Sequence, residues 1–255
     1  MDIDKYRFVA HRGIHQNDAN NVENSIPAFR AAVEKNIGIE LDVHLTKDHY
    51  LVVVHDHNLE KITGVNKIVE ELSLKEIKEL KLLGTNNQIP TFEEVLKVVD
   101  GKVPIIIEIK NRGTVGALES KLFEVLKKYD GEYAIESFNP LSLLWFKKHD
   151  KSMIRGQLSA KKIDTISPFL NFFLSKMLFN VFVKPDFIAY KIEDITEKMY
   201  NKYHKNGIYL IGWTLTSKDE YDRYNKLCDG MIFDHYEKLM GIINAKENIY
   251  DNEKN

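Results

Sequence analysis

Short apolar segments rich in β-branched and aromatic residues recur along the whole chain and alternate with segments of helical spacing. The apolar segments predict strands over 6–10, 38–43, 51–55, 103–109, 133–137, 153–158, 187–190, 208–213 and 230–233. The other segments predict helices over 25–36, 73–82, 91–99, 115–128, 140–149, 193–205 and 217–226, with Ser25 and Thr91 as N-caps. This alternation indicates the α/β class and a parallel sheet wrapped by helices, which we expect to close into a TIM-type (β/α)8 barrel.

The predicted barrel is irregular in three places. Nine candidate strands compete for eight positions, and the link from Val43 to Leu51 is too short for a crossover helix between parallel strands. Two segments are expected to be insertions, 57–100 after the third strand and 160–185 between the sixth and seventh strands. We expect one barrel domain over 1–245 and a polar tail over 246–255 that frays.

The amino-acid composition limits which partners and which cellular compartment we expect for the protein. The chain has 36 Lys+Arg against 38 Asp+Glu, a net charge of -2, so no sequence-wide basic field exists to hold nucleic acid. An anionic substrate must therefore be held by local charges. The only cysteine, Cys228, excludes internal disulfides and a Cys-based zinc site and is expected to pack as a small apolar residue. With no apolar signal segment in residues 1–7, a cytoplasmic location is expected.

Two histidines come at the ends of predicted strands, where barrels build active sites. His11, followed by Arg12, ends the apolar run Phe8-Val9-Ala10, and His55 ends the run from Leu51 to Val54. Asp56, next to His55, could fix the orientation of that imidazole. Phosphodiester cleavage needs one group to take a proton and another to give one, and two histidines suit both roles.

Acidic residues also alternate along two predicted strands. Glu40 and Asp42 are two residues apart and therefore face the same side of their strand, and Glu108 with Lys110 repeats the pattern. The alternative is a polar face open to water. Inside a barrel, however, facing acids cost several kcal/mol unless a cation compensates. Oxygen ligands of this type suit Mg²⁺, Ca²⁺ or Mn²⁺ rather than zinc, and such a metal with Arg12 would neutralise phosphate oxygens.

Taken in order, several short runs resemble the glycerophosphodiester phosphodiesterase family. They are Ala10-His11-Arg12-Gly13, Glu23-Asn24-Ser25, Glu40-Leu41-Asp42-Val43, Thr46-Lys47-Asp48, Val54-His55-Asp56, Ile89-Pro90-Thr91 and Glu108-Ile109-Lys110. The resemblance continues weakly through Ser137-Phe138-Asn139-Pro140, Gly212-Trp213-Thr214 and Asp229-Gly230-Met231-Ile232.

This resemblance implies a TIM-type barrel and a metal-dependent hydrolase that releases sn-glycerol 3-phosphate and an alcohol. It implies the following roles: Glu40, Asp42 and Glu108 as metal ligands, His11 and His55 as acid and base, Arg12 and Lys110 on phosphate, Asn24 supporting the metal ligands, and Trp213 against the glycerol carbons. By resemblance to phospholipase-C-like barrels, the glycerol 2-hydroxyl would attack phosphorus first.

Two departures from the family pattern affect the leaving-group side. Glu136 stands where the family usually has Gln; it could point at solvent, but we expect it to face inward, where it could add charge near the metal and favour a cationic head group. The family's closing Thr-Asp-x-Pro is Phe233-Asp234-His235-Tyr236. Surface roles are expected for the acid Glu119 and for the remaining histidines, which are His15, His44, His49, His57, His149, His204 and His235; His15 and His57 are near enough to be secondary candidates.

The segment 166–183 has twelve apolar positions out of eighteen. Lys176 and polar residues interrupt it, so we do not expect it to span a membrane. It could pack on the barrel, but we expect a helical flap beside the mouth that presents Phe172, Phe179 and Phe182 to acyl chains or a membrane surface. The alternative function is therefore a lipid phosphodiesterase acting on lysophospholipids. A barrel that binds phosphorylated ligands without catalysis is a third hypothesis, and the oligomeric state is open.

Overall fold

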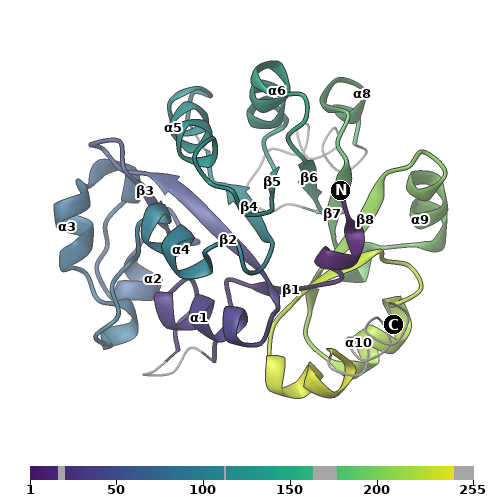
Figure 1. Ribbon diagram of the computed structural model, residues 1–255, viewed down its shortest axis with the longest axis horizontal. Helices are drawn as coiled ribbons and strands as arrows, with labels where there is room; N and C mark the ends of the chain where they lie inside the picture. The colour runs from purple at the N-terminus through teal and green to yellow at the C-terminus, as the bar shows by residue number, and fades with distance from the viewer. Residues whose placement is uncertain (17–20, 112, 163–176, 244–255) are drawn as a thin grey trace.

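Eight parallel strands close into a barrel in the computed structural model, which describes residues 1–16, 21–111, 113–162 and 177–243 (Figure 1). The strands are β1 Phe8–His11, β2 Gly38–Leu45, β4 Ile105–Ile109, β5 Tyr133–Ser137, β6 Arg155–Ser159, β7 Phe187–Lys191, β8 Tyr209–Leu215 and β9 Gly230–Phe233. They are neighbours in the order β1-β9-β8-β7-β6-β5-β4-β2, and β1 pairs with β2 to close the ring. The predicted α/β TIM-type barrel is confirmed.

The ninth strand, β3 (Leu51–Val53), lies outside the ring. It runs antiparallel to β2, with Val53 opposite Val43. The amide of Thr46 donates to the carbonyl of Tyr50, which closes a tight turn between the two strands. A turn of this length can only reverse the chain, so the expected irregularity is present as a hairpin on the barrel.

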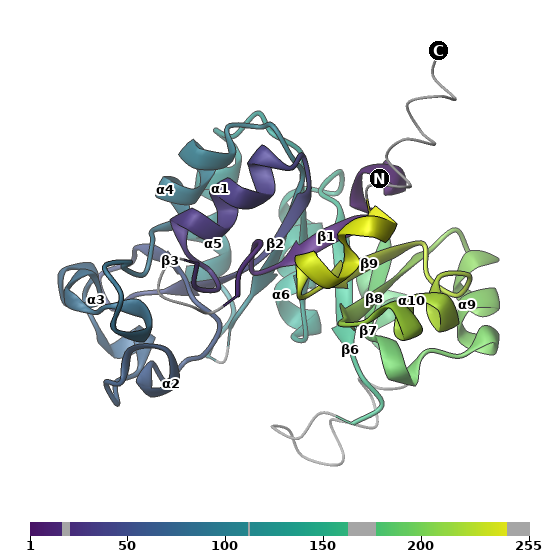
Figure 2. The ribbon, with the colours of Figure 1, turned by 90° about the horizontal axis from the view of Figure 1, so that it is seen from below.

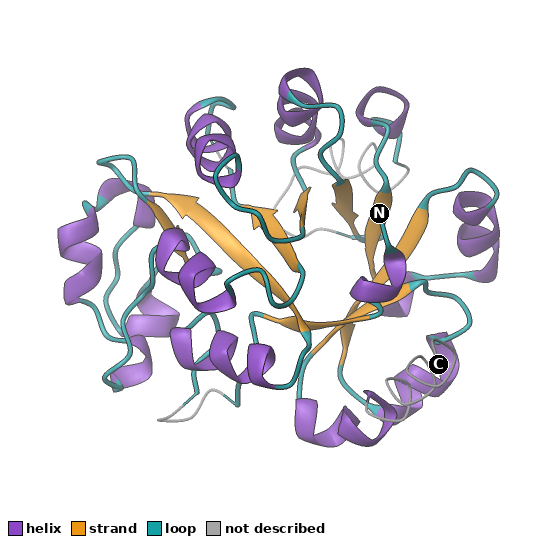
Figure 3. Cartoon of the chain, in the orientation of Figure 1, coloured by secondary structure: helices purple, strands orange, loops and turns teal. Residues whose placement is uncertain are grey.

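Helices surround the barrel on its outside (Figure 3). They are α1 Ile26–Glu34, α4 Phe92–Val99, α5 Ala117–Leu126, α6 Pro140–His149, α8 Asn180–Val183, α9 Glu197–His204, α10 Lys218–Tyr224 and a last helix over 236–243. The side chain of Ser25 accepts the amide of Ala28, and Thr91 with Glu94 forms a capping box, so both predicted caps are confirmed. Short 3₁₀ turns lie at Ile3–Tyr6 and Ile192–Asp194.

The side chains of each strand alternate between two apolar layers. The layer inside the barrel includes Val9, Ile106, Ala134, Phe187, Ile211 and Ile232. Alternate residues such as Ile39 and Leu41 pack outward against the helices. Inside the barrel a Cβ on Gly156 would lie 2.1 Å from Cζ of Phe187, so glycine leaves room for that ring. The lower barrel is therefore filled with side chains, and a site can form only at its upper, C-terminal end.

An excursion between β3 and α4 forms a small layer of its own beside the barrel, at the left of Figure 2. It contains α2 Glu60–Thr63, η2 Val69–Glu71, α3 Leu74–Glu79 and η3 Leu82–Gly84. Its apolar side chains cluster with those of Val52 and Val54. Because α4 packs against α1 within the ring, the inserted part ends before α4 and is narrower than the predicted 57–100.

The described part of the second predicted insertion lies in the helical ring. In 177–183, α8 packs against α6, and Lys147 of α6 donates to the carbonyl of Phe182. Three residues separate α8 from the start of β7, so this part sits toward the N-terminal end of the barrel and not beside the mouth. The expectation of a flap at the mouth is therefore wrong for Phe179 and Phe182.

Two other predictions, the flap position of Phe172 and the frayed tail, concern residues outside the described part of the chain. Residues 163–176, including Phe172, and the tail 246–255 lie outside the described part of the chain. Within the part that is described, no helix is both long and apolar enough to cross a membrane.

Candidate active site

Three buried carboxylates meet at the C-terminal ends of neighbouring strands. Glu40 on β2, Glu108 on β4 and Glu136 on β5 place one carboxylate oxygen each within 4.8 Å of one another. The strand register accounts for two of them, because Glu108 pairs with Glu136, while Glu40 lies two residues before Asp42, the register partner of Glu108. The expected inward orientation of Glu136 is confirmed. This oxygen-only set has the chemistry that a hard divalent cation requires.

Asp42 lies beside this cluster but is held by other partners. Its Oδ1 is 3.0 Å from Nζ of Lys110, and its Oδ2 accepts a hydrogen bond from Nδ2 of Asn24 over 2.8 Å. Lys110 also contacts Oε1 of Glu108 over 2.8 Å. The lysine therefore bridges two of the three predicted metal ligands, and Asn24 contacts one of them.

Arg12 connects the end of β1 to the same acids. Its amide donates to Oε2 of Glu40 over 3.1 Å, and its guanidinium contacts Oε1 of Glu23 over 2.5 Å and Oδ2 of Asp42 over 3.5 Å. The residue adopts a left-handed conformation with φ 56°, which turns the chain sharply after His11. The turn places the guanidinium of Arg12 beside the carboxylate cluster.

Burial and mutual repulsion control the charge of the cluster. Burial raises the pKa of Glu40 and of Glu136 well above the ordinary range, and neighbouring carboxylates raise both further. Burial raises the pKa of Glu108 to about 7, against the opposing effect of Lys110. Burial also opposes ionisation of Asp42, yet Lys110, His55 and Arg12 together lower its pKa well below the ordinary value. A cation among the three glutamates would therefore displace protons as it binds.

His55 is positioned by the acid that follows it. Its Nδ1 lies 2.7 Å from Oδ1 of Asp56, as the sequence predicts. A carboxylate only accepts hydrogen bonds, so Nδ1 carries the proton and Nε2 is left as a base. Burial lowers the pKa of His55 to about 4. The imidazole is therefore neutral at physiological pH and able to accept a proton.

His11 has a carboxylate partner of its own. Nδ1 of His11 lies 3.0 Å from Oδ1 of Asp234, at the end of β9, and Nε2 of His15 lies 3.5 Å from the same oxygen. Burial opposes ionisation of Asp234, but the contacts with His11 and His15 lower its pKa. The sequence analysis assigned no role to Asp234, which keeps the Asp of the family's closing Thr-Asp-x-Pro, and its distance from His11 along the chain gave no sign of this contact.

Trp213 lies on the opposite wall, on β8. Its ring meets Phe138 edge-on with centroids 6.0 Å apart. Its Nε1 is buried and has no hydrogen-bond partner among the described residues. An indole in this place offers an apolar face and one free donor to a bound molecule.

Two expectations about polar residues, the surface positions of His44 and Glu119, were wrong. His44 was expected at the surface but is fully buried, with Nδ1 3.0 Å from Oε1 of Glu70 and Nε2 3.1 Å from the carbonyl oxygen of His55. His57, a secondary candidate, contacts the same oxygen of Glu70 over 2.6 Å. Glu119 is also fully buried and accepts hydrogen bonds from Ser142 and the amide of Gly116. The alternation of Glu40 and Asp42 continues to His44, which was the available signal for burial.

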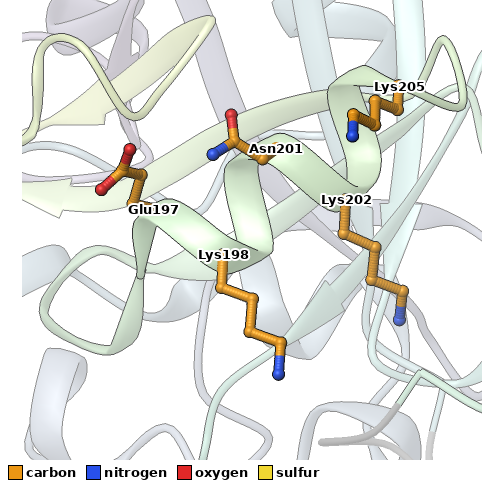
Figure 4. A pocket seen from close by; sticks show the side chains of 5 residues that line it. All are labelled: Glu197, Lys198, Asn201, Lys202 and Lys205. Carbon is orange, nitrogen blue, oxygen red and sulfur yellow. The ribbon is translucent and has the colours of Figure 1, made fainter.

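The excursion forms one wall beside His55. A narrow cleft there is lined by Glu23, Asn24, Val54, His55, Asp56, Lys61, Ile62 and Leu82. Lys61 and Ile62 belong to α2, so inserted residues approach one of the two predicted catalytic histidines. A more open hollow, shown in Figure 4, is lined by Glu197, Lys198, Asn201 and Lys202 of α9 and by Lys205, which follows that helix, and it contains none of the site residues.

Comparison with known proteins agrees with this geometry. Residues 11–238 match the sequence profile of the Glycerophosphoryl diester phosphodiesterase family. The chain belongs to this family. It is 34% identical to a glycerophosphodiester phosphodiesterase of Caldanaerobacter subterraneus subsp. tengcongensis over 94% of this chain and 98% of that one. The predicted class, a phosphoric diester hydrolase, is thereby confirmed.

Relatives in the family also include proteins from animals and solved structures. The chain is 29% identical to lysophospholipase D GDPD1 of Rattus norvegicus, over 94% of this chain and 88% of that one. Its fold matches a phosphodiesterase of Oleispira antarctica, solved in complex with the product sn-glycerol-3-phosphate, with a TM-score of 0.79 and 20% identity over 93% of this chain and 96% of that one. At that identity the structural match supports the barrel alone.

Proposed function

We propose that the protein hydrolyses glycerophosphodiesters to sn-glycerol 3-phosphate and an alcohol, with one divalent metal held by Glu40, Asp42 and Glu108. The observation that carries this proposal is the meeting of two carboxylate-paired imidazoles and a buried carboxylate cluster at one end of the barrel. His11 is the register partner of Glu40, and the charge of Asp42 acts on His55. Family membership makes phosphodiesters the substrate class to test first.

The donor set fits a cation of the Mg²⁺, Ca²⁺ or Mn²⁺ type. All of the proposed ligand atoms are carboxylate oxygens, and Oε2 of Glu136 is buried without a hydrogen-bond partner among the described residues. When bound, such a cation would withdraw charge from the phosphate oxygens. Arg12 and Lys110 would hold the same oxygens from the protein side, and Trp213 would cover the glycerol carbons.

The two histidines have different partners and so suit different roles. His55 is neutral with Nε2 free, which supports a role as general base. The carboxylate of Asp234 can balance the charge of a protonated His11, which supports a role as general acid. Both imidazoles are held by the proton on Nδ1, so Nε2 is the reacting atom in each.

The reaction balances in two steps. His55 takes the proton of the glycerol 2-hydroxyl, and the 2-oxygen bonds to phosphorus. The bond from phosphorus to the alcohol breaks, and the alcohol leaves with a proton from His11. Water then attacks the phosphorus of the cyclic phosphate, and His11 takes a proton from this water. The bond from phosphorus to the 2-oxygen breaks, and His55 returns its proton to that oxygen. The sum is one diester and one water giving sn-glycerol 3-phosphate and one alcohol.

A lipid phosphodiesterase acting on lysophospholipids is the second candidate. The relative named lysophospholipase D favours it, because a lysophospholipid is itself a glycerophosphodiester with an acyl chain. This candidate includes contact of the segment 166–183 with a membrane surface. The exposure of Val181 (74%) and Phe182 (64%) supports such a contact.

Activity against glycerophosphocholine, with and without chelator, tests the proposal. We expect release of sn-glycerol 3-phosphate with added Mg²⁺, Ca²⁺ or Mn²⁺ and its loss in excess chelator. Full activity in excess chelator would refute the metal dependence. A parallel assay with a long-chain lysophospholipid, compared by kcat/KM, separates the two candidates.

A further inference from the structure

We propose that His44, His57 and Glu70 form a second metal site, which takes a divalent transition-metal ion of the Zn²⁺ class and fastens the excursion to β2. One possible ligand atom from each of the three side chains lies within 4.8 Å of those from the other two. None of these residues belongs to the proposed catalytic metal site, so this inference does not rest on the proposed function.

The backbone places two of these side chains next to each other within the excursion. The amide of Val69 donates to the carbonyl of His57 over 2.9 Å, so the segment that leads into Glu70 runs beside His57. Nδ1 of His57 lies 2.6 Å from Oε1 of Glu70. His44 reaches the same oxygen from β2, with its Nδ1 3.0 Å away. Two separate parts of the chain therefore converge on one carboxylate.

The hydrogen bonding of His44 is that of a metal ligand. Its Nε2 lies 3.1 Å from the carbonyl oxygen of His55, which can only accept, so Nε2 carries the proton of the neutral ring. Nδ1 then presents a lone pair to an ionised carboxylate, which is also only an acceptor. Two acceptors at this distance require a cation between them or a charged ring. A charged ring is costly here because His44 is fully buried. Histidines that bind metal through one nitrogen usually donate to a carbonyl or carboxylate from the other.

The donor atoms determine the class of ion. Two imidazole nitrogens and one carboxylate oxygen suit Zn²⁺, Co²⁺ or Ni²⁺, whereas Mg²⁺ and Ca²⁺ prefer oxygen ligands alone. Ligands of a tetrahedral Zn²⁺ ion are about 3.3 Å apart, so the carboxylate of Glu70 must draw back slightly from both rings. Its side chain is 38% exposed, which allows this movement and lets water reach the fourth position.

Calorimetric titration of Zn²⁺, in excess Mg²⁺ to supply the carboxylate cluster, tests the site. We expect Zn²⁺ to bind wild type and to raise its Tm, because the ion would join the excursion to the barrel. His57→Gln and Glu70→Gln should each weaken this binding at least about ten-fold and remove most of the rise in Tm. Both side chains are partly exposed, so both variants should fold, and the buried His44 is left in place.

Two further variants serve as controls. His204→Gln, at an exposed position, removes a histidine elsewhere and should bind Zn²⁺ as wild type does. Glu108→Gln changes the carboxylate cluster and should keep the Zn²⁺ binding that His57→Gln loses.

Two results would overturn the inference. One is wild-type affinity for Zn²⁺ in both His57→Gln and Glu70→Gln. The other is a lower Tm of these variants while Zn²⁺ leaves the Tm of wild type unchanged, because the three side chains would then form a hydrogen-bonded cluster only. Neither result bears on the proposed hydrolysis, which is measured separately as release of sn-glycerol 3-phosphate.

Discussion

His44 donates a hydrogen bond from Nε2 to the carbonyl oxygen of His55, over 3.1 Å. The other ring nitrogen of His44 lies 3.0 Å from Oε1 of Glu70, in the excursion after β3. A fully buried imidazole thus joins strand β2, the backbone of a proposed catalytic histidine and the inserted layer. The excursion therefore helps to fix the position of His55, in addition to lining the cleft beside it.

The first prediction concerns this connection. His44→Phe keeps an aromatic ring but removes the partner of the His55 carbonyl and leaves the carboxylate of Glu70 with His57 alone of its two imidazole contacts. We expect a loss of stability of about 1–3 kcal/mol and a fall in kcat with little change in KM, because the imidazole of His55 is displaced and the substrate contacts are not. Urea unfolding and steady-state kinetics at a temperature where the variant is folded measure both. His204→Phe, at an exposed position, is the control; a rise in KM alone would contradict the positioning role.

The second prediction concerns His11 and its carboxylate. His11→Ala should lower turnover by about 10² to 10⁴ without unfolding the protein, and His55→Ala should do the same. Asp234→Asn should lower kcat by a smaller factor, because His11 stays in place but loses the charge that holds its tautomer. Asp219→Asn, on the exposed face of α10, provides the matched control. Wild-type kcat in Asp234→Asn would exclude any part for that carboxylate.

The third prediction concerns pH and the carboxylate cluster. The pKa of Glu108 is about 7 in the folded protein and about 4.5 in the unfolded chain, so the folded state holds the proton more tightly. This contribution to stability is complete below about pH 4.5 and is lost as pH rises through 7. The metal-free protein should therefore lose on the order of 1 kcal/mol between pH 6 and 8.

A bound divalent cation should reverse that trend, because it competes with the protons of the same carboxylates. Thermal unfolding with and without Mn²⁺ across this range measures both slopes. Glu108→Gln should flatten the metal-free slope, and Glu124→Gln should leave it unchanged. A metal-free stability that rises from pH 6 to 8 would show that these carboxylates are ionised throughout.

Sequence periodicity was sufficient for the barrel because its strands are local apolar runs whose alternation is uninterrupted. The same alternation placed Glu40, Asp42 and Glu108 on inward faces. His11 and His55 were identified because they end predicted strands. These features need only one strand at a time, which is why they could be predicted.

Contacts between distant strands could not be predicted in the same way. The contact of His11 with Asp234 joins β1 to β9 across closure of the barrel, and the contact of His44 with Glu70 depends on how the excursion folds back. The apolar density of 166–183 resembled a lipid-facing flap, but in its described part α8 packs on α6, with Met177 and Val183 buried while Val181 and Phe182 stay exposed. Pattern alone cannot distinguish an exposed apolar face from one covered by a neighbouring helix.

The fourth prediction concerns the apolar layer below the site. Gly156→Ala would place a methyl group against the ring of Phe187, and the closed barrel leaves that ring no room to move. We expect a loss of about 1–3 kcal/mol in urea unfolding. Gly241 lies in the helix over 236–243, and a Cβ at this position would have no neighbouring atom of the described residues within 4 Å. Gly241→Ala should therefore stabilise the protein by up to about 1 kcal/mol. Equal stabilities for the two variants would show that the interior is not filled as described.

The last prediction separates two routes for an acyl chain. Leu141 is 57% exposed in the first turn of α6, which follows the C-terminal end of β5 and so lies on the side of the mouth. Phe182 is similarly exposed on α8, but α8 lies toward the opposite end of the barrel. If a lysophospholipid enters with its phosphate at the carboxylate cluster, its acyl chain leaves through the mouth and can reach only the first of these side chains. Leu141→Ser should then lower kcat/KM for a long-chain lysophospholipid and spare glycerophosphocholine, whereas Phe182→Ser should spare both. A selective loss of lysophospholipid hydrolysis in Phe182→Ser, together with weaker binding to anionic vesicles, would instead show that α8 approaches a membrane during turnover.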